Sequence, residues 1–586
     1  MLGKAQGNNE WLDINDARVR FYSNGHIAWA DGSDPPGYFV PASSNTSPLF
    51  SAGIWIGGVD EQGQLKVAAH MYGVDQDFHP GPLSTGGAAT ISPAVSQAYD
   101  QLWKVNATDV LMHQQYQQCV QDPNCDPSIQ FPGYTIPDAF STWPAHGDVS
   151  ENQALYLAPF FDLGADNVYD PTNGDHPCVP GDQALYMIFN DNTAPHMQSL
   201  GLPIGLEVHM MPFAYTNDDP SLEQTIFIHY RLVNRSSHTL NNVFLGTFAD
   251  ADLGCYNDDF IGSDVGRNMM FFYNSTDVDA ACSGSEGYGS TPPAFGIVTL
   301  KGPMVDANGS DDPQELSLPS YNGTAFNDGV ADNERHGLSR MISFAQGTGM
   351  SDPSVASQFY SSLQGIMNNG APITYGGTGY ESDTSLASIP TFFMFPWDTD
   401  TLGVGTGGTP MPPWQETQPT PNSPDRRGLA SMGPFTLEAG EEDDILIAYV
   451  FARAESGGAL ASVDVLKARV DSVHAFAETI PGIMSPGSPC DQIGVGIEHP
   501  GSIADRIQLY PNPAKDMITL AFGERMDAVI QIHDVRGRSI LHTRSKDERV
   551  PIDISSLPAG LYHVQAITAS GILNGRFVKE GSAGTR

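Results

Sequence analysis

Two acidic stretches of the sequence have the residue types and spacing to bind a hard metal ion. In the first, oxygen-bearing side chains stand at relative positions 1, 5, 9, 12 and 14, which are Asp162, Asp166, Asp170, Asn173 and Asp175. This spacing approximates a looped calcium site. Position 3 is Gly164, and position 12 is Asn in place of Glu, so backbone carbonyl groups or water would have to complete the ligand set. The stretch predicts a structural calcium clamp, with an acidic surface turn as the alternative.

The second acidic stretch follows a predicted strand that ends at Phe248. It contains Asp250, Asp252, Asn257, Asp258, Asp259 and Asp264. Carboxylates this close in sequence can converge on one calcium ion, and Cys255 could pin the loop that carries them. A glycosidase needs two carboxyl groups about 5–10 Å apart, so the same residues also offer a catalytic alternative. A solvated loop is the third interpretation.

Histidines and known catalytic motifs give less support to an enzyme. Glu207 and His209 share one face of a predicted strand and His229 lies on the next, a pattern more typical of satisfied, half-buried histidines than of a metal site. His146 and Asp148 could form an acid/base pair or simply a turn. The motifs Gly-x-Ser-x-Gly and His-Glu-x-x-His and a phosphate-binding loop do not occur. The sequence therefore favours a protein without catalytic activity over a hydrolase.

Six cysteines indicate an oxidising compartment. Cys119 and Cys125 enclose a short, turn-rich loop, whereas Cys255 and Cys282 enclose part of the second acidic stretch. If both pairs form disulfides, loop entropy makes them worth roughly 2 and 3.5 kcal/mol respectively. The remaining cysteines, paired or free, are Cys178 and Cys490.

Composition and periodicity favour β structure. The 586 residues include 61 Gly and 44 Pro, which is typical of many short strands joined by turns. Alternating apolar residues predict paired strands over 205–215 and 225–234, and residues 444–451 predict a strand that is buried on both faces. Apolar residues three or four apart predict a helix over 458–480. We therefore expect a mainly β protein with a multi-strand β-sandwich body and a few helices.

The chain is too long for one ordinary domain. We divide it into an N-terminal β-rich region, a β-sandwich body with acidic loops, a Gly/Pro/Ser-rich linker and a small C-terminal β domain. Their predicted boundaries are 1–140, 141–480, 481–504 and 505–586.

The net charge of −41 belongs to the part of the chain before the C-terminal domain. Residues 501–586 carry 11 Lys and Arg against 9 Asp and Glu, whereas the whole chain carries 27 against 68. Such an acidic body repels nucleic acid and anionic lipid, and it suits calcium-bearing external water. A run of 18 apolar residues does not occur, so we expect no transmembrane segment. Met1 to Gly7 is too short and too polar for a signal peptide, which suggests a trimmed or misassigned start.

The segment 507–580 contains four ordered sequence blocks within a small predicted β domain. Tyr510-Pro511-Asn512-Pro513 fixes φ twice and suits a rigid entry to an edge strand. The later blocks run from Ile532 to Arg538, from Leu557 to Tyr562 and from Gly575 to Lys579. In the order and spacing of these blocks, the segment resembles the type A C-terminal sorting domain of the type IX secretion system. The corresponding sorting-signal residues are Tyr510, Pro511, Asn512, Pro513, Asp534, Gly537, Gly560, Tyr562 and Lys579.

This resemblance implies a destination for the protein. In that family the domain is an immunoglobulin-like β-sandwich that the outer-membrane translocon recognises. It is usually removed while the body is released or anchored at the cell surface. We therefore expect the protein outside the cell, or on the outer surface, of a Gram-negative bacterium.

The body also resembles an uncharacterised family of secreted proteins that carry the same domain. The matching segments are Ile54 to Gly58, Trp143 to Asp148, Gly181 to Ala184, Asp250 to Gly254 and Asp425 to Arg427. This resemblance implies no established activity. We expect a calcium-stabilised, secreted or surface-displayed protein that binds an extracellular glycan or protein, or has a structural role. The alternatives are a self-assembling filament or coat subunit, which would be a homo-oligomer, and a secreted hydrolase of polysaccharide or peptide.

Overall fold

The computed structural model separates the chain into two compact units, Met1–Val495 and Gly496–Arg586, which are described here one at a time. In the first unit it describes residues 7–29, 36–72, 75–282, 284–314, 321–345, 350–379, 389–416 and 425–480. In the second it describes residues 508–511, 514–522, 525, 528–533, 539–558, 560–568 and 571–579. The predicted linker, residues 481–504, lies outside the described residues.

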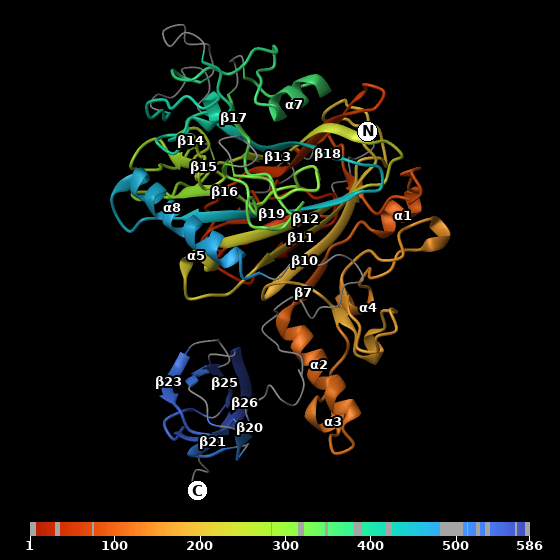
Figure 1. The fold of residues 1–586 in the computed structure, drawn as a ribbon, viewed down its shortest axis with the longest axis vertical. Coiled ribbons are helices and arrows are strands. Elements are labelled where there is room, and N and C mark those ends of the chain that lie inside the picture. Colours follow the sequence, from red (N-terminus) through yellow and green to blue (C-terminus); the bar gives the residue numbers. More distant parts are fainter. Residues whose placement is uncertain are drawn as a thin grey trace. The chain divides into compact units, whose positions relative to one another are not determined.

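A nine-stranded antiparallel sheet forms the centre of the first unit (Figure 1). Its strand order is β14-β15-β16-β19-β12-β11-β10-β6, and β7 also pairs with β10. The strands are β6 (His79–Pro80), β7 (Trp103–Asn106), β10 (Gln183–Asn190), β11 (Leu206–Ala214), β12 (Thr225–Asn234), β14 (Asp259–Asp264), β15 (Met269–Asn274), β16 (Ala294–Lys301) and β19 (Glu442–Ala452). The predicted strands at 205–215, 225–234 and 444–451 are thus confirmed as β11, β12 and β19.

A five-stranded antiparallel sheet packs on one face of the nine-stranded sheet. Its order is β17-β18-β13-β4-β5. The strands are β4 (Ser51–Asp60), β5 (Leu65–Ala69), β13 (Leu240–Asp250), β17 (Arg340–Phe344) and β18 (Arg427–Leu437). Because β4 pairs with β13, and β7 with β10, the predicted regions 1–140 and 141–480 share both large sheets.

Alternation along the strands builds two hydrophobic cores, one on each face of the nine-stranded sheet. On β19, Ile445 and Ile447 point into the core between the sheets, whereas Leu446 and Ala448 point into a second core on the opposite face. Helix α8 (Gly458–Ala477) covers that opposite face, which confirms the helix predicted over 458–480 (Figure 1). Helix α7 (Ala356–Leu363) packs on the five-stranded sheet, where Phe359 meets Trp55 with 4.7 Å between ring centroids.

Short elements complete the first unit. The additional strands are β1 (Asn9–Leu12), β2 (Arg18–Tyr22), β3 (Tyr38–Phe39), β8 (Phe160–Phe161) and β9 (His176–Pro177). The short and peripheral helices are α1 (Pro93–Ala98), α2 (Ala107–Gln121), α3 (Pro127–Gln130), α4 (Asp138–Ser141), α5 (Pro220–Glu223), η1 (Val149–Glu151), η2 (Pro171–Asn173) and η4 (Val404–Thr406). Among the described residues, none of the helices combines the length and apolarity needed to cross a membrane.

The second unit is a small immunoglobulin-like sandwich of two antiparallel sheets, with orders β20-β21-β24 and β23-β22-β25-β26. Its strands are β20 (Gln508–Tyr510), β21 (Met517–Ala521), β22 (Ala528–His533), β23 (Ser539–Ser545), β24 (Arg549–Asp553), β25 (Gly560–Thr568) and β26 (Gly571–Lys579). Its core contains side chains from both sheets, such as Ile518 and Leu520 from one and Ile530 and Val564 from the other. The predicted mainly β fold, with a sandwich body and a C-terminal sandwich, is confirmed.

Candidate metal centre

The pairing of three strands assembles an acidic site at one end of the five-stranded sheet. Strand β13 ends at Asp250, which stands opposite Ser51 at the start of β4 and opposite Arg427 at the start of β18. Asp252 follows two residues beyond the end of β13, and Asp425 lies two residues before the start of β18. Antiparallel pairing therefore brings together carboxylates that are 175 positions apart in sequence, as the numbers of Asp250 and Asp425 show.

Asp250, Asp252 and Asp425 form an acid triad whose ligand atoms all lie within 4.8 Å of one another. Asp250 is only 5% exposed, whereas the other two members are partly exposed. Oδ2 of Asp250 accepts a hydrogen bond from the Tyr72 hydroxyl at 2.9 Å. Oδ1 of Asp250 and Oδ1 of Asp425 are buried and have no hydrogen-bond partner. The triad thus brings three carboxylates together while two of their buried oxygens lack a hydrogen-bond donor, which suits a hard cation.

The guanidinium group of Arg427 lies beside this acidic site. Arg427 is 1% exposed, and its Nη1 donates to Oδ2 of Asp352 at 2.6 Å. Its Nη2 lies 3.6 Å from Oδ2 of Asp425, while its Nε and Nη2 are buried without a hydrogen-bond partner. The neighbouring Arg426 is turned away, with its Nη2 2.7 Å from Oε1 of the buried Glu416. Arg427 therefore offsets the charge of Asp352 and Asp425 directly, and Arg426 contributes a weaker electrostatic effect at Asp425.

Burial and mutual repulsion raise the pKa values of the triad. Burial, followed by repulsion from Asp252 and Asp425, raises the pKa of Asp250 well above its ordinary value. For Asp252, burial and then the charge of Asp425 raise the pKa to about 8, although Arg427 opposes the shift. Burial likewise raises the pKa of Asp425. A divalent cation at this place would stabilise the ionised carboxylates and displace their protons.

The rest of the second acidic stretch divides into two places. Asp258 and Asp259 lie at the start of β14, and the N–H of Leu253 donates to Oδ2 of Asp259 at 2.9 Å. Asp264 stands at the other end of β14, roughly 17 Å away at the usual rise of a strand, where it forms an ion pair of 2.9 Å with Arg267. The structure therefore separates Asp264 from the carboxylates that sequence spacing groups with it.

In the first acidic stretch, the carboxylates bind the N–H groups of their own loop. Oδ1 and Oδ2 of Asp175 accept from Leu163 and Asp170 at 2.9 and 2.8 Å. Oδ2 of Asp162 accepts from Asn167 at 2.6 Å, and Oδ1 of Asp166 accepts from Val168 at 2.9 Å. Asp170 caps helix η2 and also accepts from the side-chain amide of Asn173 at 2.6 Å. Oδ1 of Asp162 is buried without a hydrogen-bond partner. Within the part of the chain that the structure describes, these carboxylates do not converge as the acid triad does, and calcium binding by this loop stays a prediction.

The candidate histidines are held by neighbouring protein groups. Nε2 of His209 lies 2.9 Å from Oε1 of Glu207, which also accepts from Arg235 at 2.6 Å. Nε2 of His229 lies 3.2 Å from Oδ2 of Asp444. Nε2 of His146 accepts from the N–H of Tyr169 at 3.0 Å and its Nδ1 faces the carbonyl of Leu155 at 3.1 Å, so this histidine fastens the first acidic stretch to the 143–157 segment.

The triad member that sequence reasoning missed is Asp425, together with Tyr72, which contacts Asp250, and Asp352, which lies near Asp425. Asp425 begins the Asp-Arg-Arg segment, which carries part of the resemblance to secreted proteins but has no spacing relation to Asp250. The signal that could have located it is the pairing of β13 with β18, because their register places Arg427 opposite Asp250. Register between distant strands is not readable from one sequence.

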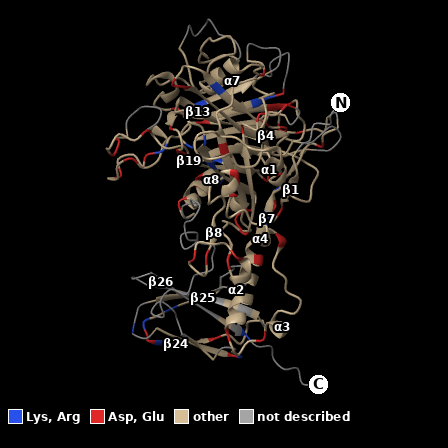
Figure 2. Ribbon diagram, turned by 90° about the vertical axis from the view of Figure 1, so that its right-hand side faces the viewer, with Lys and Arg blue, Asp and Glu red and all other residues tan. Residues whose placement is uncertain are grey.

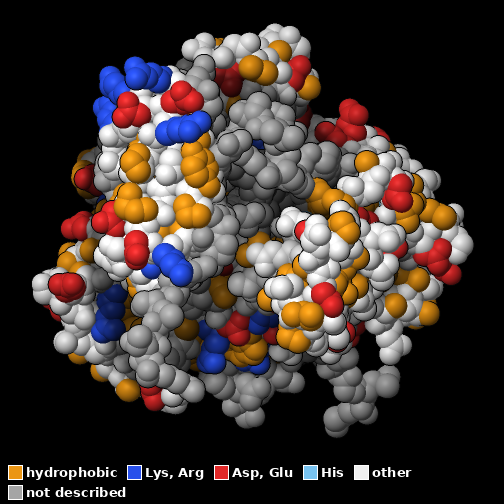
Figure 3. All heavy atoms as spheres, turned by 90° about the horizontal axis from the view of Figure 1, so that it is seen from below, with side chains coloured by type: hydrophobic (Ala, Val, Ile, Leu, Met, Phe, Trp, Pro, Cys, Tyr) orange, Lys and Arg blue, Asp and Glu red, His pale blue; other side chains and the backbone are white. Residues whose placement is uncertain are grey.

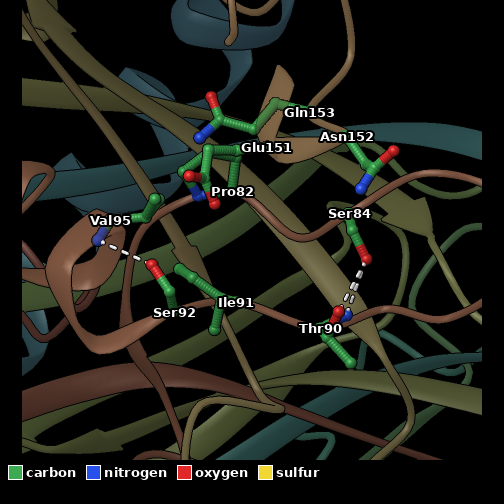
Figure 4. Close-up of a pocket in the computed structure, with 9 residues that line it drawn as sticks. All are labelled: Pro82, Ser84, Thr90, Ile91, Ser92, Val95, Glu151, Asn152 and Gln153. Atoms are coloured by element: carbon green, nitrogen blue, oxygen red, sulfur yellow. Dashed lines mark hydrogen bonds between the residues drawn. The ribbon is translucent and has the colours of Figure 1, made fainter. Parts of the chain in front are cut away.

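A shallow polar pocket of about 290 Å³ lies apart from the acid triad (Figure 4). Ser84 and Thr90 are joined by a hydrogen bond of 3.0 Å, and Ser92 caps helix α1 by accepting from Val95 at 3.3 Å. Because the lining hydroxyl groups satisfy one another, this pocket presents few free groups for chemistry. Its lining residues are Pro82, Ser84, Thr90, Ile91, Ser92, Val95, Glu151, Asn152 and Gln153.

Both predicted disulfides are confirmed. Cys119–Cys125 joins the end of α2 to the turn that follows it, and Cys255–Cys282 joins the β13–β14 connection to the segment after β15. Cys178 is also disulfide-bonded. Acidic residues are spread along the chain of the first unit (Figure 2). On the face shown in Figure 3, acidic side chains stand among uncharged and apolar ones.

The second unit positions part of the sorting signal. Tyr510 ends β20, and Gly560 begins β25. The Tyr562 hydroxyl donates to the carbonyl of Pro558 at 2.8 Å, and its ring stacks on Phe577 with centroids 5.4 Å apart. Lys579 ends β26 and is 7% exposed. The predicted signal residues Asn512, Pro513, Asp534 and Gly537 lie outside the described residues.

Residues 508–580 match the family described as the secretion system C-terminal sorting domain. The chain therefore carries a type IX sorting domain, and the protein is secreted to the exterior or the surface of the cell. This confirms the resemblance found in the four sequence blocks, and it identifies the type IX secretion machinery as a partner. The match covers the second unit and leaves the activity of the first unit unassigned.

Similarity to other proteins is remote. No curated protein matches the sequence. A protein from Bacteroides vulgatus with an immunoglobulin-like β-sandwich fold is 22% identical over 13% of this chain and 84% of its own, with a TM-score of 0.12. A polysaccharide lyase is 6% identical over 64% of this chain and 34% of its own, with a TM-score of 0.17. Dimeric latent PorU from Porphyromonas gingivalis is 11% identical over 68% of this chain and 32% of its own, with a TM-score of 0.11.

Proposed function

We propose that the first unit is a calcium-stabilised β-sandwich that acts outside the cell without catalysis, by binding a glycan or protein or by contributing to an extracellular structure. The observation that carries this proposal is the acid triad, in which three carboxylates converge and Oδ1 of Asp250 and of Asp425 have no hydrogen-bond partner. The sorting domain delivers such a protein to external water, where calcium is available.

Calcium suits the acid triad better than other common cations. The converging ligands are carboxylate oxygens, which hard cations prefer, and they include neither histidine nor cysteine. The two partly exposed members leave room for water or carbonyl oxygens to complete a ligand shell of six to eight, as calcium requires. The ion would join the ends of β13 and β18 and offset the excess of negative charge around Arg427.

The catalytic alternative has one supporting observation, the pKa of Asp252, which burial raises to about 8. A carboxyl group that keeps its proton near neutral pH can serve as a general acid. However, three carboxylates each place one oxygen within 4.8 Å of the others, at the lower limit of the roughly 5–10 Å that separates the two carboxyl groups of a glycosidase. This spacing favours a shared cation over a separated acid and nucleophile.

The cation is tested by thermal unfolding of the full chain after chelator treatment and after return to about 1 mM calcium. With an affinity typical of extracellular modules, near 10⁻⁴ M, calcium adds roughly 1.4 kcal/mol to the stability. We expect Asp425→Asn to remove this calcium effect and Asp464→Asn, an exposed change on α8, to keep it. An equal calcium effect in both variants would refute the proposed site.

The binding role is tested with a panel of polysaccharides and extracellular proteins. The full chain is incubated with each ligand, and both retention and released product are measured. We expect retention without released sugar or peptide, and electron microscopy of the same samples would reveal filaments if the chain assembles. Release of product that Asp252→Ala abolishes, in a variant that stays folded, would replace this proposal with the hydrolase.

A further inference from the structure

Arg427 and Asp250 are direct neighbours across β18 and β13, yet their charged groups do not form an ion pair. The register of the two strands places these residues opposite each other. Side chains in such positions have Cβ atoms about 4.5–5.5 Å apart, close enough for a guanidinium to bind a carboxylate. Among the residues that the structure describes, the ion-pair partners of Arg427 are instead Asp352, at 2.6 Å, and Asp425, at 3.6 Å. The guanidinium is therefore directed away from its cross-strand neighbour.

Asp352 is the residue that holds the Arg427 guanidinium. Nη1 of Arg427 donates to Oδ2 of Asp352 at 2.6 Å, whereas Nε and Nη2 are buried without a hydrogen-bond partner. Asp352 comes from a segment outside the strands that carry the acid triad, just before α7. This segment is fastened in place, because the carbonyl of Ser351 accepts the side-chain amide of Asn368 at 2.5 Å. Arg427 thus makes its short, charge-assisted hydrogen bond to a fixed carboxylate outside the triad.

Tyr72 stands where the missing ion pair would be. Its hydroxyl donates to Oδ2 of Asp250 at 2.9 Å and accepts from Nη1 of Arg427 at 3.5 Å. The hydroxyl therefore fixes one oxygen of Asp250 without neutralising its charge, and Oδ1 keeps no hydrogen-bond partner. Groups behind a metal ligand commonly orient it in this way. The hydrogen bonds from Asp352 through Arg427 and Tyr72 thus end at a carboxylate that remains ionisable and free on one side.

We propose that Asp352 is a positioning residue that regulates the acid triad, because it holds the Arg427 guanidinium out of hydrogen-bonding contact with the triad carboxylates. This inference rests on the proposed function, since it concerns the cation of the triad. Without the Asp352 carboxylate, the guanidinium would turn towards Asp250 and Asp425 and offset their charge in place of the cation. Arg427 is thus a built-in competitor of calcium, and the calcium affinity depends on a residue outside the triad.

The test is a double-mutant cycle in calcium affinity. Calcium titration calorimetry is performed on the metal-free full chain, on Asp352→Asn, on Arg427→Met and on the double variant. We expect Asp352→Asn to weaken calcium binding roughly 10- to 100-fold, as the loss of other outer-shell partners does. Arg427→Met should bind calcium at least as tightly as the unaltered chain. The double variant should match Arg427→Met, because Asp352 then has no guanidinium to hold. Asp464→Asn, an exposed change on α8, should leave the affinity unchanged.

The cycle separates this inference from the proposed function. If Asp352→Asn weakens binding equally with and without Arg427, Asp352 acts only through its own charge and the inference is overturned. An unchanged affinity in Asp352→Asn, or weaker binding in Arg427→Met, would overturn it as well, while calcium binding by the unaltered chain would leave the proposed function standing. Failure of the unaltered chain to bind calcium would refute the proposed function itself. Circular dichroism checks the fold of each variant, and Arg427→Gln replaces Arg427→Met in the cycle if the latter unfolds.

Discussion

The two acidic stretches of this protein differ in which groups donate hydrogen bonds to their carboxylates. In the loop 162–175, the aspartates accept hydrogen bonds from N–H groups of the same loop, as Asp175 does from Leu163 and Asp170. At the end of β13, Asp250 receives one hydroxyl group, and its second oxygen receives nothing. In the loop, Oδ1 of Asp162 is also buried without a hydrogen-bond partner. The two stretches therefore differ in that the loop's own N–H groups hold most of its carboxylates, whereas the carboxylates of the acid triad converge.

The cause of this difference is the backbone around each carboxylate. A turn leaves its N–H groups unused by secondary structure, so nearby Asp side chains accept them. At the end of an antiparallel strand, the N–H groups belong to the ladder with neighbouring strands, so a carboxylate there must find a partner from elsewhere. Strand ends that gather several aspartates are thus better places for a cation than acidic turns of the same composition.

The largest effect should follow the loss of Arg427, whose buried guanidinium lies against the acid triad. We predict that Arg427→Met lowers the free energy of unfolding of the metal-free protein by about 3–5 kcal/mol, because the buried guanidinium is the counter-charge of the partly buried Asp352 and Asp425 carboxylates. Calcium should restore part of this loss. Urea unfolding with chelator and with calcium measures both quantities.

The control for this change is Arg549→Met, which removes an arginine whose side chain is 69% exposed. We expect an effect within about 0.5 kcal/mol for this surface change. Loss of stability in Arg427→Met that calcium leaves unchanged would show that the arginine matters only for packing, and the contrast between the two acidic stretches would then lose its electrostatic basis.

The next effect is a pH dependence that calcium should suppress. The pKa of Asp252 rises from its ordinary 3.8 to about 8 in the folded chain. A raised folded pKa stabilises the protein below pH 3.8, and this contribution is lost as the pH rises towards 8. We therefore predict that the melting temperature of the chelated protein falls between pH 5 and pH 8 by more than that of the calcium-loaded protein.

Melting curves at pH 5, 6.5 and 8, with and without calcium, measure this dependence. At the proposed site, calcium would displace the protons of the triad, so its stabilising effect should grow as the pH rises. The Asp252→Asn variant is the control, because it keeps the shape of the side chain without its titration. A pH dependence that is the same in this variant would place its origin in other carboxyl groups.

The sequence correctly predicted local features of this molecule, such as single strands and helices, but it did not predict contacts between residues far apart in the chain. Periodicity located β11, β12, β19 and α8, because each is a continuous segment with one or two buried faces. The four blocks of the sorting domain were readable for the same reason, since the match lies within one short segment.

The acid triad could be predicted from the sequence only in part. Asp250 and Asp252 were predicted together because they are neighbours in sequence, but Asp425 joins them through the register of β13 on β18. Asp264 shows the opposite error, because it is near Asp259 in sequence and yet stands at the far end of β14. An extended strand separates sequence neighbours, and pairing unites distant residues.

A smaller effect is expected at Asp175 in the first acidic stretch. We predict that Asp175→Asn costs about 1–3 kcal/mol, because the buried side chain exchanges an oxygen that accepts an N–H for an amide that donates. This loss should be the same with chelator and with calcium, as measured by urea unfolding. A loss that appears only with calcium would make Asp175 a metal ligand and remove the contrast with the acid triad.

The smallest effect is expected at Asp166, and it decides most directly whether the first acidic stretch binds calcium. Its Oδ1 accepts one exposed N–H, from Val168 at 2.9 Å, so Asp166→Ala should change the free energy of unfolding by about 0.5 kcal/mol. If the loop acts as a self-satisfied turn, the number of calcium ions bound per chain stays unchanged. If the spacing of its aspartates creates a calcium site, the same variant loses one bound calcium while its stability without calcium hardly moves. Equilibrium dialysis of Asp166→Ala and of Asp425→Asn therefore compares the two stretches in one measurement. Loss of a metal ligand lowers the number of calcium ions bound per chain, whereas loss of a turn residue leaves that number unchanged, even if both changes have a small effect on stability.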